Sequence, residues 1–170
     1  MRFIRWLPKA LRREEPVLEA PAVIIAEALL VAIAGELHAD SRKQHEGIVY
    51  LLGRTDGSVT VALAASHPEA ITTRGSFEVS AVNMSRVVRA AADACLQVIG
   101  QLHTHPGPAF HSEGDVAGAR IKYPGYVSIV VPDYGSALPG LEGSACYFYE
   151  AGHRFREMAT DDVHIVPVTI

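Results

Sequence analysis

Two histidines and an aspartate lie close together in the stretch HTHPGPAFHSEGD, which runs from His103 to Asp115. Residues two apart on a β-strand point to the same side, so His103 and His105 can present imidazole nitrogens to one metal ion. The following loop is rich in proline and glycine and can bring the carboxylate of Asp115 back toward them. Three protein ligands with a fourth position open to water are typical of a catalytic zinc site.

An HxH pair alone is weak evidence, because such pairs arise by chance and buried histidines bonded to the backbone are commoner than metal ligands. The longer pattern here, HxHP followed by five residues and then SxxD, is far more specific. It resembles the signature of the JAMM, or MPN-plus, zinc metalloproteases. That signature also has an upstream segment ExxGxLxG, and EGIVYLLG from Glu46 to Gly53 matches it except that Val49 replaces the inner glycine.

The resemblance implies a role for each of these residues. His103, His105 and Asp115 would bind Zn²⁺, one ion per chain, which activates water and polarises the scissile carbonyl. Glu46 would accept the proton of that water and pass it to the leaving amine. Ser112 would donate a hydrogen bond to the oxyanion of the tetrahedral intermediate.

Each role has a simpler alternative. Glu46 could be a solvated acid at the start of a strand near Lys43, and Ser112 could be an ordinary helix N-cap. Asp115 could be only a favourable partner for the helix dipole or half of a capping box. The combined pattern favours the catalytic role of Glu46 and the ligand role of Asp115, and an N-cap role of Ser112 does not exclude its catalytic role.

Four further residues with reactive or metal-binding side chains are left out of the predicted site. His111 could reach the metal and Glu113 could replace Glu46 as the base, but both are more often surface residues of a loop or first helical turn. Cys95 and Cys146 fall in apolar settings and lack the PCxxC context of zinc deaminases, so we expect buried thiols.

The resemblance also implies a substrate class. JAMM enzymes cut peptide or isopeptide bonds after the C-terminal glycine of ubiquitin-like proteins, and the chain looks similar to their small stand-alone bacterial relatives. Such enzymes remove a modifier from its target or mature its precursor, often beside activating and conjugating enzymes. One alternative is processing of a small sulfur-carrier protein, and another is a non-catalytic MPN-type scaffold. A DNA-repair relative is disfavoured because the chain has no large basic region.

The composition limits the hypotheses on domain number, partners and location. The chain has 170 residues, 49% of them hydrophobic, and a net charge of -4. One core suffices for this length, and the missing basic excess argues against a nucleic-acid partner. Two distant cysteines favour a reducing, cytoplasmic location over a disulfide framework. The apolar run at 20–35 is too short for a membrane span and contains Glu27.

The predicted elements give a mixed α/β layer fold. The resemblance implies the three-layer, cytidine-deaminase-like JAMM/MPN fold, a mixed, mostly antiparallel sheet flanked by helices. A basic, aromatic arm at 1–16, without the features of a signal peptide, precedes one domain at 17–170. Pro21 should open a core helix whose apolar residues are Val23, Ala26, Leu30, Ile33 and Leu37. Helices are also predicted at 80–94 and 112–121, and strands at 47–53, 58–65, 96–103, 126–132, 145–150, 153–158 and 163–168.

Overall fold

The computed structural model describes residues 22–150 and 154–167. The predicted arm at 1–16 and the predicted turn at 151–152 lie outside this part of the chain. The described helices are α1 (Glu27–Lys43), α2 (Ala81–Asp93) and α3 (Glu113–Gly118), with short 3-10 turns at Asp133–Gly135 and Thr160–Asp162. The described strands are β1 (Ala22–Ala26), β2 (Ile48–Thr55), β3 (Val59–Ser66), β4 (Ile71–Thr72), β5 (Phe77–Glu78), β6 (Gln97–Thr104), β7 (Val127–Val131), β8 (Ala145–Tyr149), β9 (Phe155–Glu157) and β10 (Val163–Val166).

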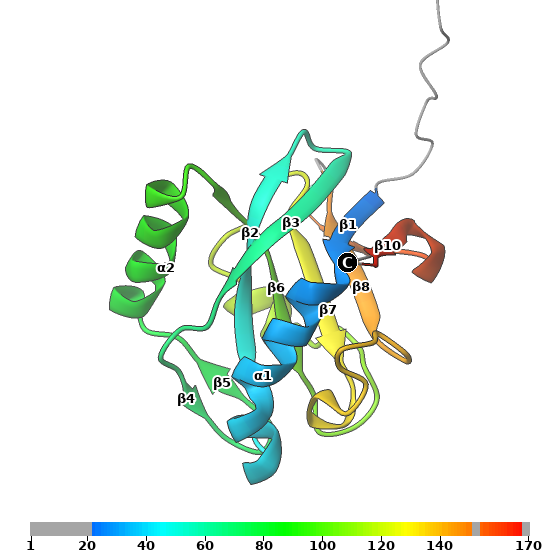
Figure 1. Ribbon diagram of the computed structural model, residues 1–170. Coiled ribbons are helices and arrows are strands. Elements are labelled where there is room, and N and C mark those ends of the chain that lie inside the picture. Colours follow the sequence, from blue (N-terminus) through cyan, green and yellow to red (C-terminus); the bar gives the residue numbers. More distant parts are fainter. Residues whose placement is uncertain (1–21, 151–153, 168–170) are drawn as a thin grey trace, which may run out of the picture.

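Within the described residues, one large sheet has the strand order β10-β1-β3-β2-β6-β7-β8-β9 (Figure 1). The pairings β2 with β3, β2 with β6, β7 with β8 and β8 with β9 are antiparallel. The pairings β1 with β10, β1 with β3 and β6 with β7 are parallel. The mixed, mostly antiparallel sheet predicted from the sequence is therefore confirmed.

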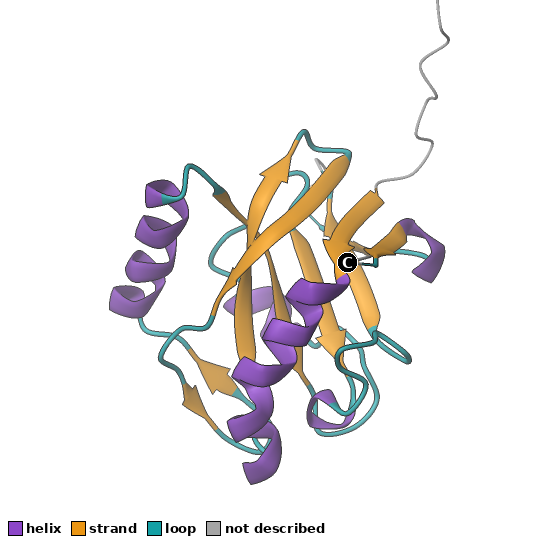
Figure 2. Cartoon of the chain, in the orientation of Figure 1, coloured by secondary structure: helices purple, strands orange, loops and turns teal. Residues whose placement is uncertain are grey.

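Helices cover both faces of this sheet (Figure 2). The α1 helix packs its buried residues Leu30, Ile33 and Leu37 against one face, in a core that includes Val49 and Leu51. The α2 helix packs Met84, Val87 and Ala91 against the other face, where Tyr50 and Leu52 point. The result is a three-layer α/β arrangement, as expected.

The first helix was predicted to begin at Pro21, which is wrong. Residues Ala22–Ala26 form β1, which lies between β3 and β10, and the helix begins only at Glu27. Three consecutive β-branched residues, Val23, Ile24 and Ile25, favour an extended chain, and burial between two neighbouring strands decides the outcome. No described helix is long and apolar enough to cross a membrane.

Two other segments also differ from the sequence prediction. A small hairpin of β4 and β5 lies between β3 and α2 and was not anticipated, because each strand has only two residues. The α3 helix ends at Gly118, three residues before Ile121, because Ala119 is extended with φ -63° and ψ 102°. Both segments border the site described next.

Candidate metal centre

Strand pairing brings Glu46 to the histidines. Ile48 of β2 lies opposite His103 of β6 in the antiparallel register. Glu46 lies two residues before Ile48 and His105 two residues after His103, so the same register, continued just past the strand ends, places Glu46 near His105. The site therefore forms where β2 begins and β6 ends.

The histidines and Asp115 converge on one point. The His103 Nε2 atom lies 3.2 Å from Oδ1 of Asp115, and the His105 Nε2 atom lies 3.4 Å from Oδ2. One ligand atom from each residue lies within 4.8 Å of the others. Metal–ligand bonds of about 2.1 Å in a tetrahedron place neighbouring ligand atoms about 3.4 Å apart. The observed separations fit such an ion.

His103 supports this fit independently. Its side chain is fully buried, and neither ring nitrogen has a hydrogen-bond partner despite the proximity of Asp115. Burial lowers the pKa of His103, which favours the neutral imidazole that metals require. Orphaned buried polar atoms are costly, and an ion between the imidazole and the carboxylate would give the Nε2 atom a partner.

Asp115 is held in the ionised form. Burial alone would raise its pKa, but contacts with His103, His105 and Ser112 together hold the pKa of this carboxyl well below its ordinary value. The same carboxylate raises the pKa of His105 through their close contact. A carboxylate and two imidazoles form a donor set suited to Zn²⁺.

Ser112 fixes Asp115 through a capping box at the start of α3. The Ser112 Oγ accepts from the backbone N–H of Asp115 at 3.1 Å, and it donates to Oδ2 of Asp115 at 2.7 Å. The backbone N–H of Ser112 donates to the same Oδ2 at 2.7 Å. The N-cap role is therefore confirmed, and in this structure the hydroxyl proton is engaged by the carboxylate.

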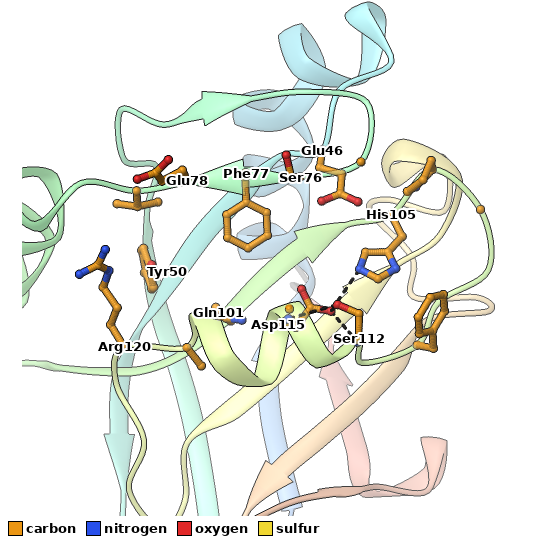
Figure 3. Close-up of a pocket in the computed structure, with 18 of the residues that line it drawn as sticks. Glu46, Tyr50, Ser76, Phe77, Glu78, Gln101, His105, Ser112, Asp115 and Arg120 are labelled. Atoms are coloured by element: carbon orange, nitrogen blue, oxygen red, sulfur yellow. Dashed lines mark hydrogen bonds and ion pairs between the residues drawn. The ribbon is translucent and has the colours of Figure 1, made fainter.

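Glu46 is not a solvated acid. The residue is only 6% exposed, and its carboxylate points into the pocket beside His105 (Figure 3). Burial raises the pKa of Glu46 to about 7, with His105 lowering it and Asp115 raising it to smaller extents. A buried carboxyl with a pKa near neutrality is suited to general acid–base catalysis.

These residues open into a pocket of about 560 Å³. The β4–β5 hairpin forms one wall, with Phe77 and Glu78, and the end of α3 with Arg120 forms the other (Figure 3). The ring of Phe77 lies 5.3 Å from that of His103, centre to centre. Tyr50 and Gln101 also line the pocket. Gln101 could have been found from the sequence, because it lies two residues before His103 and so shares its side of β6.

His111 differs from the surface residue expected from the sequence. Both of its ring nitrogens are buried without a hydrogen-bond partner, and burial lowers its pKa to about 4. The ring stacks on Tyr147 at 4.7 Å and meets Phe155 edge-on at 4.5 Å. His111 lies outside the group of converging ligands, whose members are His103, His105 and Asp115 among the described residues.

The two cysteines also differ from each other. Cys146 is buried, as predicted, and burial raises the pKa of its thiol to about 12. Cys95 is exposed at the end of α2, with φ 55°, so the prediction of a buried thiol there is wrong. The pattern failed because Cys95 occupies the tight connection between a helix and a strand.

Comparison with known proteins agrees with this site. The family model described as prokaryotic homologs of the JAB domain matches residues 26–139, well over half of the chain. The chain belongs to this family. Its JAB-domain match includes Glu46, both histidines, Ser112 and Asp115. The JAMM resemblance seen in the sequence is thereby confirmed.

Solved structures support the fold of this JAB-family chain. A protein from Desulfitobacterium hafniense matches with a TM-score of 0.60 and 14% identity, over 86% of this chain and 92% of that one. A protein from Salinibacter ruber matches with a TM-score of 0.52 and 22% identity, over 77% and 84%. A search of curated proteins finds no significant match. Family and site together indicate a JAMM-type metallohydrolase whose substrate these comparisons do not identify.

Proposed function

We propose that the protein is a zinc metallopeptidase that hydrolyses the peptide or isopeptide bond after the C-terminal glycine of a ubiquitin-like protein. The observation that carries the proposal is the meeting of Glu46 with the converging His103, His105 and Asp115 side chains in one pocket of a JAB-family fold. These three residues would hold the zinc ion. One ion per chain follows from the single group of this kind among residues 22–150 and 154–167.

Zinc bound there would lower the pKa of a water molecule and polarise the scissile carbonyl. Glu46 would take the proton of the attacking water onto its carboxylate. As the carbon–nitrogen bond breaks, Glu46 would release that proton to the departing amine, which leaves as a neutral amine. The buried position of Glu46 keeps its carboxyl in the range where both transfers are feasible.

Ser112 is proposed to stabilise the oxyanion of the tetrahedral intermediate. Its Oγ carries one proton, which is donated to Asp115 in the structure. For the proposed role, that hydroxyl turns from Asp115 toward the carbonyl oxygen as charge develops. Its backbone N–H remains bonded to Asp115, so the carboxylate keeps one of its anchors while the hydroxyl acts.

The pocket supports an extended, glycine-ending substrate. Strand β5 pairs with β4 along one edge, and its residues Phe77 and Glu78 line the pocket. An extended tail can add to such a strand edge through backbone hydrogen bonds. Phe77 packs close to His103, and we expect its ring to restrict side chains next to the scissile bond and so to favour glycine.

The proposed partner is therefore a ubiquitin-like protein, either as a precursor or attached to a target. On the basis of the family resemblance, we further propose that activating and conjugating enzymes of the same pathway associate with the protein. Both deconjugation and precursor maturation require the same attack on the carbonyl of a terminal glycine, so the proposed chemistry covers both.

The direct test is cleavage of ubiquitin-like domains fused through a C-terminal glycine to a reporter. Mass spectrometry of the products should show one cut immediately after that glycine, and replacing the glycine by valine should abolish it. A matched reporter joined through an unrelated flexible linker should stay intact. Cleavage of both fusions at unrelated sites, or of neither, would contradict the proposal.

A further inference from the structure

Thr104 lies between the two metal-binding histidines but faces away from the metal. The residue is 1% exposed and ends strand β6, which pairs with β2. Its Oγ1 accepts a hydrogen bond from the backbone N–H of Gly47 at 2.8 Å, and its own N–H donates to the Gly47 carbonyl at 3.0 Å. Both backbone polar groups of Gly47 are thus engaged by one residue.

The partner of Thr104 is the residue directly after Glu46. The N–H of Gly47 belongs to the peptide group that contains the Glu46 carbonyl, so the Thr104 hydroxyl fixes the peptide plane that follows the Glu46 Cα. The plane before it is fixed too, because the N–H of Glu46 donates to the Thr73 carbonyl at 2.8 Å. With both planes held, the direction of the Glu46 Cα–Cβ bond is set.

The surroundings leave this peptide few other partners. A Cβ atom on Gly47 would lie 2.7 Å from Cδ2 of Leu37 and 3.5 Å from Cβ of Asp40, both on α1. The helix therefore packs directly against the peptide, and the peptide N–H is buried beside it. If the Thr104 hydroxyl were removed, that N–H would lose its acceptor, and the segment would have to shift to regain one.

We infer that Thr104 is a positioning residue for Glu46. It holds the proton-accepting carboxylate in place relative to His103 and His105, the residues on either side of Thr104 in the chain. This inference rests on the proposed function, since it assigns Glu46 a role in hydrolysis. Thr104 itself touches no reacting atom. Small displacements of a catalytic group cost large factors in rate, so its effect appears in turnover and not in metal binding.

The discriminating variant is Thr104→Val, which keeps the branched shape and removes the acceptor, with Thr104→Ser as the matched control. We expect Thr104→Val to keep its zinc and its KM while kcat falls about tenfold or more. Thr104→Ser should stay within about threefold of wild type. In a Glu46→Ala background, Thr104→Val should cause no further loss, because it acts through Glu46.

A second readout does not depend on activity. Crystal structures of wild type and Thr104→Val should show a displaced or multiply placed Glu46 carboxylate, with His103, His105 and Asp115 unchanged. An unmoved Glu46, a wild-type kcat, or an equal loss in the Glu46→Ala background would overturn the inference. If wild type cleaves no ubiquitin-like fusion, the proposed function fails, and the two crystal structures still decide whether Thr104 places Glu46.

Discussion

The two faces of strands β2 and β6 differ in the side chains they carry. The face toward α1 carries apolar side chains, with Val49, Leu51 and Leu102 each fully buried in one hydrophobic core. The opposite face carries Gln101 and His103, which are just as inaccessible to solvent but polar. These side chains are similarly buried on both faces, so the faces differ in the polarity of the buried groups and not in their exposure.

Only some of the buried polar side chains on this face have hydrogen-bond partners within the protein. Gln101 donates to Ser128 at 3.3 Å and accepts from Tyr126 at 3.4 Å, so its amide has partners. His103, two residues along the same strand, has none for either ring nitrogen. A buried polar group left without a partner costs stability, and a metal ion held by His103 would offset that cost. The face toward α1 stabilises the fold. The other face holds a second hydrophobic core under α2 and, near the end of β6, the polar groups suited to chemistry.

The largest predicted effect separates catalysis from metal binding on the polar face. Glu46→Ala should keep its zinc and its thermal stability yet lose about 10²- to 10⁴-fold in kcat, because it removes the proton acceptor and no ligand. Glu113→Ala is the control, since Glu113 is an exposed acid in the adjacent helical turn. Stopped or continuous cleavage assays measure both. If Glu113→Ala were the inactive variant, the roles of the two acids would have to be exchanged.

On the apolar face the expected effect is on stability. Leu51→Ala should lower the free energy of unfolding by about 2–5 kcal/mol, because Leu51 is fully buried and truncation leaves a cavity. Leu63→Ala, at a residue 57% exposed on β3, should change it by less than about 0.5 kcal/mol. Denaturant titration measures both. Below the unfolding transition Leu51→Ala should keep its zinc, and loss of zinc from folded protein would show that the faces are not separable.

Two serine N-caps allow helix capping to be separated from catalysis. Ser80 caps α2 and Ser112 caps α3, each accepting from the backbone N–H three residues on. Replacing either by alanine should cost about 1 kcal/mol of stability. Only Ser112→Ala should also lower kcat, by about 10²-fold, if its hydroxyl stabilises the oxyanion. Equal activities in the two variants would leave Ser112 with a capping role alone.

The smallest predicted effect is a pH dependence. Glu46 must be deprotonated to accept a proton, and burial raises its pKa to about 7. Activity should therefore rise with pH and fall about tenfold per unit below that pKa. A nearby zinc ion lowers the pKa of a carboxyl, so the midpoint should lie at or below about 7. The residual activity of Glu46→Gln should not show this fall at low pH. An unchanged pH profile in that variant would assign the fall to another titrating group.

Much of the site could be predicted because its determinants are local. Ser112 caps a helix whose third residue is Asp115, and the alternation of a strand places His103 and His105 together. The β2–β3 hairpin also followed from Asp56 and Gly57, where Oδ1 of Asp56 accepts from Ser58 and Val59 and Gly57 has φ +95°. Glu46 needed the family signature, since its nearness to His105 depends on strand register.

The remainder depends on contacts between distant segments. The run 22–26 is short and apolar, which suits a buried helix or a buried strand equally, and only its pairing with β3 and β10 decides. The β4–β5 hairpin has two residues per strand, too few for a periodic signal. The burial of the His111 ring nitrogens follows from packing against Tyr147 and Phe155, which are remote in the sequence.

The central claim is that the polar face holds a catalytic zinc ion, and the metal content of the protein tests it most directly. Wild type, His103→Ala and His111→Ala should be purified without chelator, checked for folding by circular dichroism, and analysed by elemental mass spectrometry. We predict close to one zinc per chain in wild type and His111→Ala, and almost none in folded His103→Ala. A folded wild-type protein without zinc, or a His103→Ala variant that keeps it, would contradict the account.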